Sequence, residues 1–147
     1  MLMIRDATLE DVEHIVVLLE ELGYPTPVEE MTERMQMLGR DSSYRAMVAV
    51  YEGKVVGMIG LAKTYFYEKR GLYIRIITLI TKSEHRNLGI GAALVKRAED
   101  WARELGATGM TVSSNKRRSD AHRFYHRLGY EDTSYTFFKR FESAPSD

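Results

Sequence analysis

The sequence predicts an α+β fold with a single hydrophobic core. Segments with the spacing of strands and of amphipathic helices follow one another in the order β-α-α-β-β-β-α-β-α-β. The chain has 147 residues, which suffices for one domain with a substantial core, and it contains no internal repeat or low-complexity linker. We therefore expect a single domain over residues 1–142, followed by a disordered tail at 143–147.

The first third of the chain predicts a strand and two helices. The strand covers residues 3–7, and Thr8 then provides a favourable N-cap for a helix that Gly23 ends. A second helix begins at Thr26 and Pro27 and runs to about Leu38. The apolar positions at helical spacing are Val12, Ile15, Val16, Leu19 and Leu22 in the first helix and Met31, Met35 and Leu38 in the second. We expect the methionines to pack in the core, although they could line a pocket.

The remaining segments predict three strands, a helix, a short strand, a further helix and a final strand. Their expected positions are 44–51, 54–67 and 72–81 for the strands, 92–105 for the helix, 110–112 for the short strand, about 121–128 for the last helix and 130–141 for the final strand or strands. The expected buried face of the 92–105 helix consists of Leu94, Ala98, Trp101, Ala102 and Leu105. Gly129 ends the last helix.

The composition excludes several classes of function. Basic and acidic residues number 21 each, so charge gives no reason to expect a nucleic acid or an anionic membrane as partner. The chain lacks cysteine, which rules out a disulfide framework and a thiolate nucleophile, and its histidines show no metal-ligand spacing. The N-terminus lacks the apolar segment of a signal peptide, and no apolar run is long enough to span a membrane. We expect a cytoplasmic protein without a metal.

The turn at residues 86–92 has the features of a phosphate-binding site. It follows the apolar strand at 72–81 and leads into a helix, whose first N–H groups lack internal partners and lie at the positive end of the helix dipole. Gly89 and Gly91 allow a ligand to approach the backbone closely, and Arg86 adds a fixed positive charge. The turn alone would also fit a plain helix start.

Two familiar phosphate-binding motifs do not fit this turn. A dinucleotide fingerprint requires a third small residue where this chain has Leu94, and an acidic residue at the end of the next strand, where it has Ser113, Ser114 and Asn115. A Walker loop requires Gly-Lys-Ser/Thr, which is absent from the turn.

The surroundings of the turn narrow the choice. The pattern Arg86-x-x-Gly89-x-Gly91 is followed, after a strand, by Asn115 and by the segment 121–130, which reads AHRFYHRLGY. Together these elements resemble the GNAT family of acetyl-CoA-dependent N-acetyltransferases, and the resemblance extends from Ile4 to Phe141. It implies a mixed central β-sheet flanked by helices. In that sheet the strands before the glycine turn and before Asn115 run parallel and splay apart, which leaves room for the pantetheine arm of coenzyme A.

The resemblance assigns a task to the turn and to the strand before it. It implies that N–H groups from Leu88 to Ala92 hold the pyrophosphate of acetyl-CoA. It also implies that the backbone near Leu79 contacts the pantetheine amides and that the Leu79 N–H points at the thioester oxygen, where it would stabilise developing charge. The residues expected to contact the co-substrate are Leu79, Ile80, Thr81, Arg86, Asn87, Leu88, Gly89, Ile90, Gly91, Ala92, Asn115 and Tyr125.

Two side chains in this set have alternative interpretations. Asn115 lies where the family often has a side chain that hydrogen-bonds the pantetheine arm, but an asparagine at a strand end is equally typical of a turn. Tyr125 is the expected catalytic residue, because a tyrosine here in the family can protonate the leaving thiolate. Its spacing on an amphipathic helix would also suit a core tyrosine.

The general base is left open. Some family members carry a glutamate at a position matching Arg75 or Ile77, whereas this chain has no carboxylate from Leu72 to Thr81. Glu68, Tyr65 or Tyr73 could act as the base, directly or through water, and the amine could also arrive without its proton.

The resemblance implies transfer of an acetyl group to the primary amine of a small molecule. The C-terminal sequence is similar to the branch that includes aminoalkylphosphonate and aminoglycoside acetyltransferases. Alternatives are a protein or peptide acceptor, a weakly catalytic acyl-CoA-binding sensor, and a toxin acting on aminoacyl-tRNA, against which the zero net charge counts. The aromatic residues at 130–141 suggest a homodimer, or they complete the sheet of the monomer.

Overall fold

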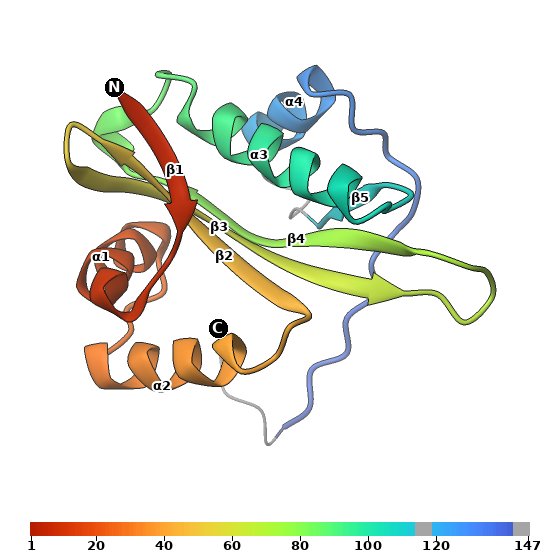
Figure 1. Cartoon of the computed structure of the whole chain (residues 1–147), viewed down its shortest axis with the longest axis horizontal. Helices are drawn as coiled ribbons and strands as arrows, with labels where there is room; N and C mark the ends of the chain where they lie inside the picture. The colour runs from red at the N-terminus through yellow and green to blue at the C-terminus, as the bar shows by residue number, and fades with distance from the viewer. Residues whose placement is uncertain (114–118, 143–147) are drawn as a thin grey trace. The chain divides into compact units, whose positions relative to one another are not determined.

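The structure is a computed structural model that describes residues 1–113 and 119–142 (Figure 1). The chain forms two compact units, residues 1–112 and residues from Ser113 onward. The strands are β1 (Leu2–Asp6), β2 (Tyr44–Tyr51), β3 (Lys54–Tyr65), β4 (Leu72–Thr81) and β5 (Met110–Val112). The helices are α1 (Val12–Leu22), α2 (Val28–Gly39), α3 (Ile90–Glu104) and, in the second unit, α4 (Ser119–Arg127).

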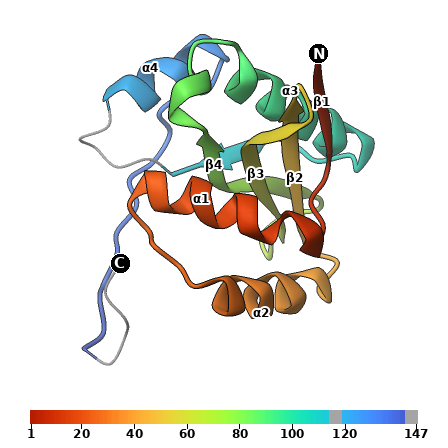
Figure 2. The ribbon, with the colours of Figure 1, turned by 90° about the vertical axis from the view of Figure 1, so that its left-hand side faces the viewer.

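The first unit is built on one five-stranded mixed sheet. Its strands lie in the order β1-β2-β3-β4-β5, with antiparallel pairing from β1 to β4 and parallel pairing between β4 and β5. Helices α1 and α2 cover one face of the sheet, and α3 covers the other (Figure 2). This arrangement confirms the predicted α+β class and the expected parallel pair of strands.

The core beneath α1 and α2 accounts for the methionines of the second helix. Met31 is buried there together with Ile15 and Leu18 of α1, and Met35 packs against the same cluster. The strands contribute Val48, Met58 and Ile80 to it. Met31 is therefore a core residue, as the helical spacing predicts.

A β-bulge in β4 changes which residues of that strand face each layer. Ile76 pairs with Leu61 and Thr78 pairs with Gly60, so Ile77 is left without a partner on β3. Because side chains alternate between faces, one extra residue reverses the alternation beyond it. Ile80 consequently lies in the core cluster beneath α1 and α2, where it pairs with Met58 of β3.

Gly57 of β3 permits the close approach of α3 to the sheet. A Cβ atom placed at this residue would lie 3.0 Å from the Ile80 carbonyl oxygen, 3.1 Å from the Ile90 side chain and 3.2 Å from the Leu94 side chain. Ile90 and Leu94 are the first buried residues of α3. The absence of a side chain at Gly57 therefore determines how closely the start of α3 lies against β3 and β4.

We expect Gly57→Ala to destabilise the protein by about 1–3 kcal/mol, the usual cost of overpacking a dense core. The added methyl group would displace the Ile80 carbonyl or the first turn of α3. Urea unfolding measures the change, and Gly39→Ala is a matched control because a Cβ at Gly39 would meet no atom within 4 Å. Equal stability of the two variants would contradict the conclusion that Gly57 is needed for the close packing of α3 on the sheet.

The helix ends differ in detail from the sequence-based expectations. Helix α3 begins at Ile90 rather than Ala92, because burial of the Ile90 side chain draws Ile90 and Gly91 into the first turn. Leu105 was expected to be buried, but it follows the last residue of α3 and is 37% exposed. Pro27, rather than Thr26, occupies the N-cap position of α2.

The second unit contains α4 and the chain that follows it. Gly129, with a φ of 90°, ends α4 as predicted. The final strand expected at 130–141 is wrong, because these residues contain no strand. Their aromatic side chains at 135, 137, 138 and 141 are exposed. Strand preference is realised only when a segment pairs with another strand and packs on a surface, and this segment is not among the sheet pairings of the described residues.

Candidate functional site

The connection from β4 to α3 forms the glycine turn predicted from the sequence. After Thr81 the chain makes a short 3-10 turn over Ser83–His85, and Arg86 is extended. Asn87 and Gly89 both have left-handed backbone conformations, with φ values of 71° and 77°. Asparagine and glycine adopt this conformation more readily than other residues, which explains their use here.

The turn presents backbone N–H groups at an open surface. The Ala93 N–H donates to the Gly89 carbonyl oxygen at 3.0 Å, so the N–H groups of Ile90, Gly91 and Ala92 precede the first bond of the helix. A Cβ at Gly89 would meet no atom within 4 Å, which leaves space for a ligand beside the backbone. This geometry is compatible with the predicted phosphate-binding site.

The side chains of the turn divide into an exposed set and a buried anchor. Arg86, Asn87 and Leu88 are exposed, whereas the Ile90 side chain is buried. Ile90 can therefore offer a ligand only its N–H group. Gly91 and Ala92 are half-buried in the first turn of α3.

Three other elements hold the segment that leads into the turn. The Lys82 N–H donates to the Val56 carbonyl oxygen of β3 at 2.7 Å, and the Ser83 N–H donates to Glu21 Oε1 of α1 at 2.8 Å. The His85 ring packs edge-on against Tyr51 of β2, with the ring centroids 5.8 Å apart. Sequence analysis missed Glu21 and Tyr51, because nothing in their local patterns indicates contact with a turn so distant along the chain.

The hydrogen bond from Ser83 affects the ionisation of Glu21. It holds the pKa of the Glu21 carboxyl below its ordinary value, and the positive charges of Lys82 and Arg86 act in the same direction. Lys82 also forms an ion pair with Glu84 at 3.1 Å. The carboxylate form of Glu21 is therefore the one that the turn stabilises.

The strand before the turn has backbone groups beyond its parallel partner. Pairing of β4 with β5 covers Ile74–Ile76 opposite Met110–Val112, while β4 continues to Thr81. Leu79 and Thr81 are half-buried and Ile80 is buried, so Ile80 can contribute only backbone groups to a ligand. The pairing ends where the expected splay would begin. Asn115 lies outside the described residues.

The predicted catalytic tyrosine lies in the second unit. Tyr125 is a half-buried residue of α4 whose ring contacts Phe124 and Tyr130, with centroid separations of 5.1 and 5.8 Å. Nearby polar contacts are an ion pair between Arg123 and Asp120 and a 3.2 Å contact between His126 Nε2 and Asp132 Oδ1. The role of Tyr125 remains a prediction.

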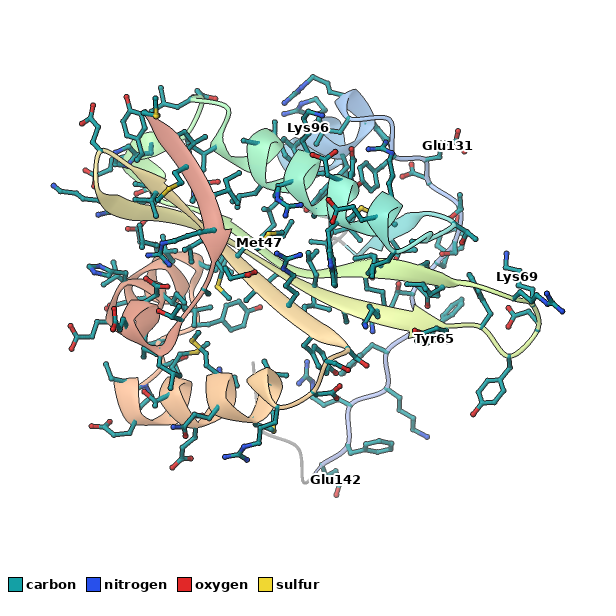
Figure 3. All side chains as sticks on the ribbon, viewed as in Figure 1. Met47, Tyr65, Lys69, Lys96, Glu131 and Glu142 are labelled. Carbon is teal, nitrogen blue, oxygen red and sulfur yellow. The ribbon has the colours of Figure 1, made fainter. Side chains whose placement is uncertain are left out.

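The possible bases belong to the connection between β3 and β4 or flank it. Tyr65 and Glu68 are exposed, and the Tyr73 ring packs against Phe66 with centroids 5.0 Å apart. Tyr65 and the neighbouring Lys69 lie at the far end of the β3–β4 hairpin (Figure 3). The contacts identify none of these groups as a base.

Three further features of the described residues concern a metal site, a membrane span and a ligand cavity. Among residues 1–113 and 119–142, no three His, Asp or Glu side chains are grouped as metal ligands, and no helix is both long enough and apolar enough to cross a bilayer. A hollow of about 390 Å³, lined in part by Ala7, Thr8, Met35 and Arg40, contains none of the predicted site residues.

Comparison with known proteins gives consistent matches. Residues 10–130 match the model of the acetyltransferase (GNAT) family. The chain is 33% identical to the aminoalkylphosphonate N-acetyltransferase of Salmonella typhimurium, over 92% of this chain and 89% of that protein. It is 31% identical to an uncharacterized N-acetyltransferase of Bacillus subtilis, over 83% of this chain and 86% of the relative.

A solved structure extends the match to the fold. A GNAT family acetyltransferase from Staphylococcus aureus superposes with a TM-score of 0.83 and 26% identity, over 95% of this chain and 98% of that chain. The mixed sheet and its parallel strand pair therefore occur in a protein whose sequence is only moderately similar.

Proposed function

This chain belongs to the acetyltransferase (GNAT) family and is an acetyl-CoA-dependent N-acetyltransferase; on that premise, we propose that its acceptor is the primary amine of a small, negatively charged molecule. Aminoalkylphosphonates are the first class to test. The observation that carries the proposal is the 33% identity to an aminoalkylphosphonate N-acetyltransferase over nearly the full length of both proteins.

An exposed arginine on β4 supports an anionic acceptor. Arg75 pairs with Ala62 across the sheet, between the buried side chains of Ile74 and Ile76, so it points to the face opposite α3. Among the described residues its guanidinium has no ion pair or hydrogen bond. A guanidinium can bind a phosphonate through two parallel hydrogen bonds. A polycationic aminoglycoside would instead be repelled by Arg75.

The glycine turn fits the phosphates of acetyl-CoA, which supplies the acetyl group as a thioester. The N–H groups from Ile90 to Ala92, which precede the first helical hydrogen bond, suit a polyanion together with the open space beside Gly89 and the exposed Arg86. In the proposed reaction the amine nitrogen bonds to the acetyl carbon, the carbon–sulfur bond breaks, and the Tyr125 hydroxyl donates a proton to the leaving thiolate.

The attacking amine must lose a proton for this reaction. No carboxylate lies between Leu72 and Thr81, and Glu68 is exposed to solvent in the β3–β4 connection. We infer that water accepts the proton. The water then either releases the proton to solvent or passes it to Glu68. The phenol of Tyr125 is restored by solvent after thiol release.

The proposal includes a homodimer that buries the aromatic side chains of residues 130–141. The support is their exposure in the single chain, which is 92% for Phe137 and 77% for Phe138. Light scattering tests this part, and a mass near the 16.9 kDa of one chain would contradict it.

The acceptor is tested by measuring thiol release from acetyl-CoA with a panel of amines. The panel contains aminoalkylphosphonates, aminoglycosides, polyamines, amino acids and short peptides. We expect the highest kcat/KM with aminoalkylphosphonates. Binding of acetyl-CoA without acetylation of any small amine would contradict the proposed substrate class and favour a protein acceptor or a sensor.

The contribution of Arg75 is expected to depend on the acceptor. Loss of charge-assisted hydrogen bonds in Arg75→Ala should raise KM for an aminoalkylphosphonate by roughly 10- to 100-fold. KM for an alkylamine of equal length that lacks the anionic group should change little, and Arg75→Lys should show an intermediate effect. An equal change for both amines would contradict a role in recognising the anion.

A further inference from the structure

A carboxylate of α1 is bonded to the segment that leads into the glycine turn. Glu21 Oε1 accepts the Ser83 N–H at 2.8 Å, across 62 positions of sequence. Glu21 lies in the last turn of α1, and Ser83 begins the 3-10 turn after β4. The contact therefore joins the helix layer on one face of the sheet to the connection that enters α3 on the other.

This bond occupies a position where the chain has no continuing strand partner. Lys82 makes the last backbone bond to β3, through the Val56 carbonyl oxygen. Within the 3-10 turn, the His85 N–H bonds to the Lys82 carbonyl oxygen at 2.9 Å. The Glu21 carboxylate thus supplies an acceptor to Ser83, just after sheet pairing has ended and before the glycine turn begins.

We propose that Glu21 is a positioning residue for the co-substrate: it holds Ser83 so that the turn from Arg86 to Ala92 is ordered before the phosphates of acetyl-CoA bind. This inference rests on the proposed function of that turn. Ordering the turn in advance lowers the entropy that binding must overcome, so the bond should contribute to affinity. Glu21 has no proposed contact with the reacting atoms.

The same geometry predicts that the Glu21 hydrogen bond and the Glu21 charge have opposite effects on the affinity for acetyl-CoA. The bond favours phosphate binding by ordering the turn. The negative charge interacts with Lys82 and Arg86, and it would weaken the attraction of these cations for phosphate. A glutamine at this position retains an acceptor oxygen and removes the charge, whereas an alanine removes both.

Glu21 is poorly suited to the alternative role of general base. Its pKa is lowered, chiefly by the backbone hydrogen bond from Ser83, so its carboxylate has reduced affinity for a proton. A base should instead have a pKa close to the working pH.

The test measures acetyl-CoA affinity by calorimetry, together with kcat, for wild type, Glu21→Ala and Glu21→Gln. We expect Kd to rise about three- to tenfold in Glu21→Ala, as the loss of one hydrogen bond predicts. Glu21→Gln should bind within twofold of wild type or more tightly. The kcat of both variants at saturating acetyl-CoA should stay within twofold of wild type.

The control is Glu20→Ala, which removes the same charge from the neighbouring exposed position of α1. Its Kd should match that of wild type. A wild-type Kd in Glu21→Ala would overturn the inference, and so would a Kd in Glu21→Gln as high as in Glu21→Ala. If wild type itself fails to bind acetyl-CoA, the proposed role of the turn fails as well, which separates the two failures.

Discussion

Gly89→Val is expected to fold and to lose affinity for acetyl-CoA by about 100-fold or more, which corresponds to about 2.7 kcal/mol. Gly89 has a φ of 77°, a conformation that a β-branched residue adopts only under strain. A valine would either place its side chain in the open space beside the first N–H groups of α3 or shift the backbone that presents them. Either change should disrupt the phosphate binding that we propose for the turn.

The expected loss is measured by calorimetric titration with acetyl-CoA. Gly106→Val is a closely matched control at the other end of α3, because Gly106 has a φ of 74° and a Cβ there would also meet no atom within 4 Å. Both variants should lose similar stability, of about 1–3 kcal/mol from backbone strain. Only Gly89→Val should lose affinity, and a folded Gly89→Val with wild-type Kd would remove the turn from the binding site.

Tyr125→Phe is expected to lower kcat by about 100-fold while leaving the Kd for acetyl-CoA within twofold of wild type. The change removes only the hydroxyl that we propose as the proton donor, and general acid catalysis typically contributes at least this factor. The ring contacts with Phe124 and Tyr130 remain possible in the variant. Steady-state kinetics with the best amine of the panel, combined with calorimetry, separates turnover from binding.

Tyr130→Phe is the matched control for Tyr125→Phe. Tyr130 is also half-buried in the second unit, and its ring contacts that of Tyr125. Loss of this hydroxyl should leave kcat near its wild-type value. An unchanged kcat in Tyr125→Phe would exclude the proton-donor role, and equal losses in both variants would indicate a structural effect on α4.

The elements governed by local patterns were predicted well from the sequence. The bounds of β2, β4 and β5 agree with the expected strands, because apolar composition and flanking turn residues mark them clearly. The glycine turn was located for the same reason, since its glycines, its arginine and the helix that follows are contiguous. The family resemblance then supplied its expected role.

The features that depend on distant partners were not predicted. The contact of Glu21 with Ser83 arises from packing of α1 beside the end of β4, and the bulge at Ile77 is defined only by pairing with β3. The prediction of a strand at 130–141 was wrong because the aromatic composition of this segment says nothing about whether a partner strand is available. In each case the deciding interaction lies outside the local sequence window.

The bulge at Ile77 has a consequence for how relatives of this enzyme can diverge. Upstream of the bulge, positions 73 and 75 point away from α3, while Ile74 and Ile76 pack beneath it. Downstream, the strand leads through the 3-10 turn at Ser83–His85 to the glycine turn. On the proposed role of Arg75, substitution at this position would change the preferred acceptor without repacking Ile74 and Ile76 or altering the glycine turn. The bulge therefore separates, along one strand, the position that we propose selects the acceptor from the segment that leads to the glycine turn, so that the two could evolve separately.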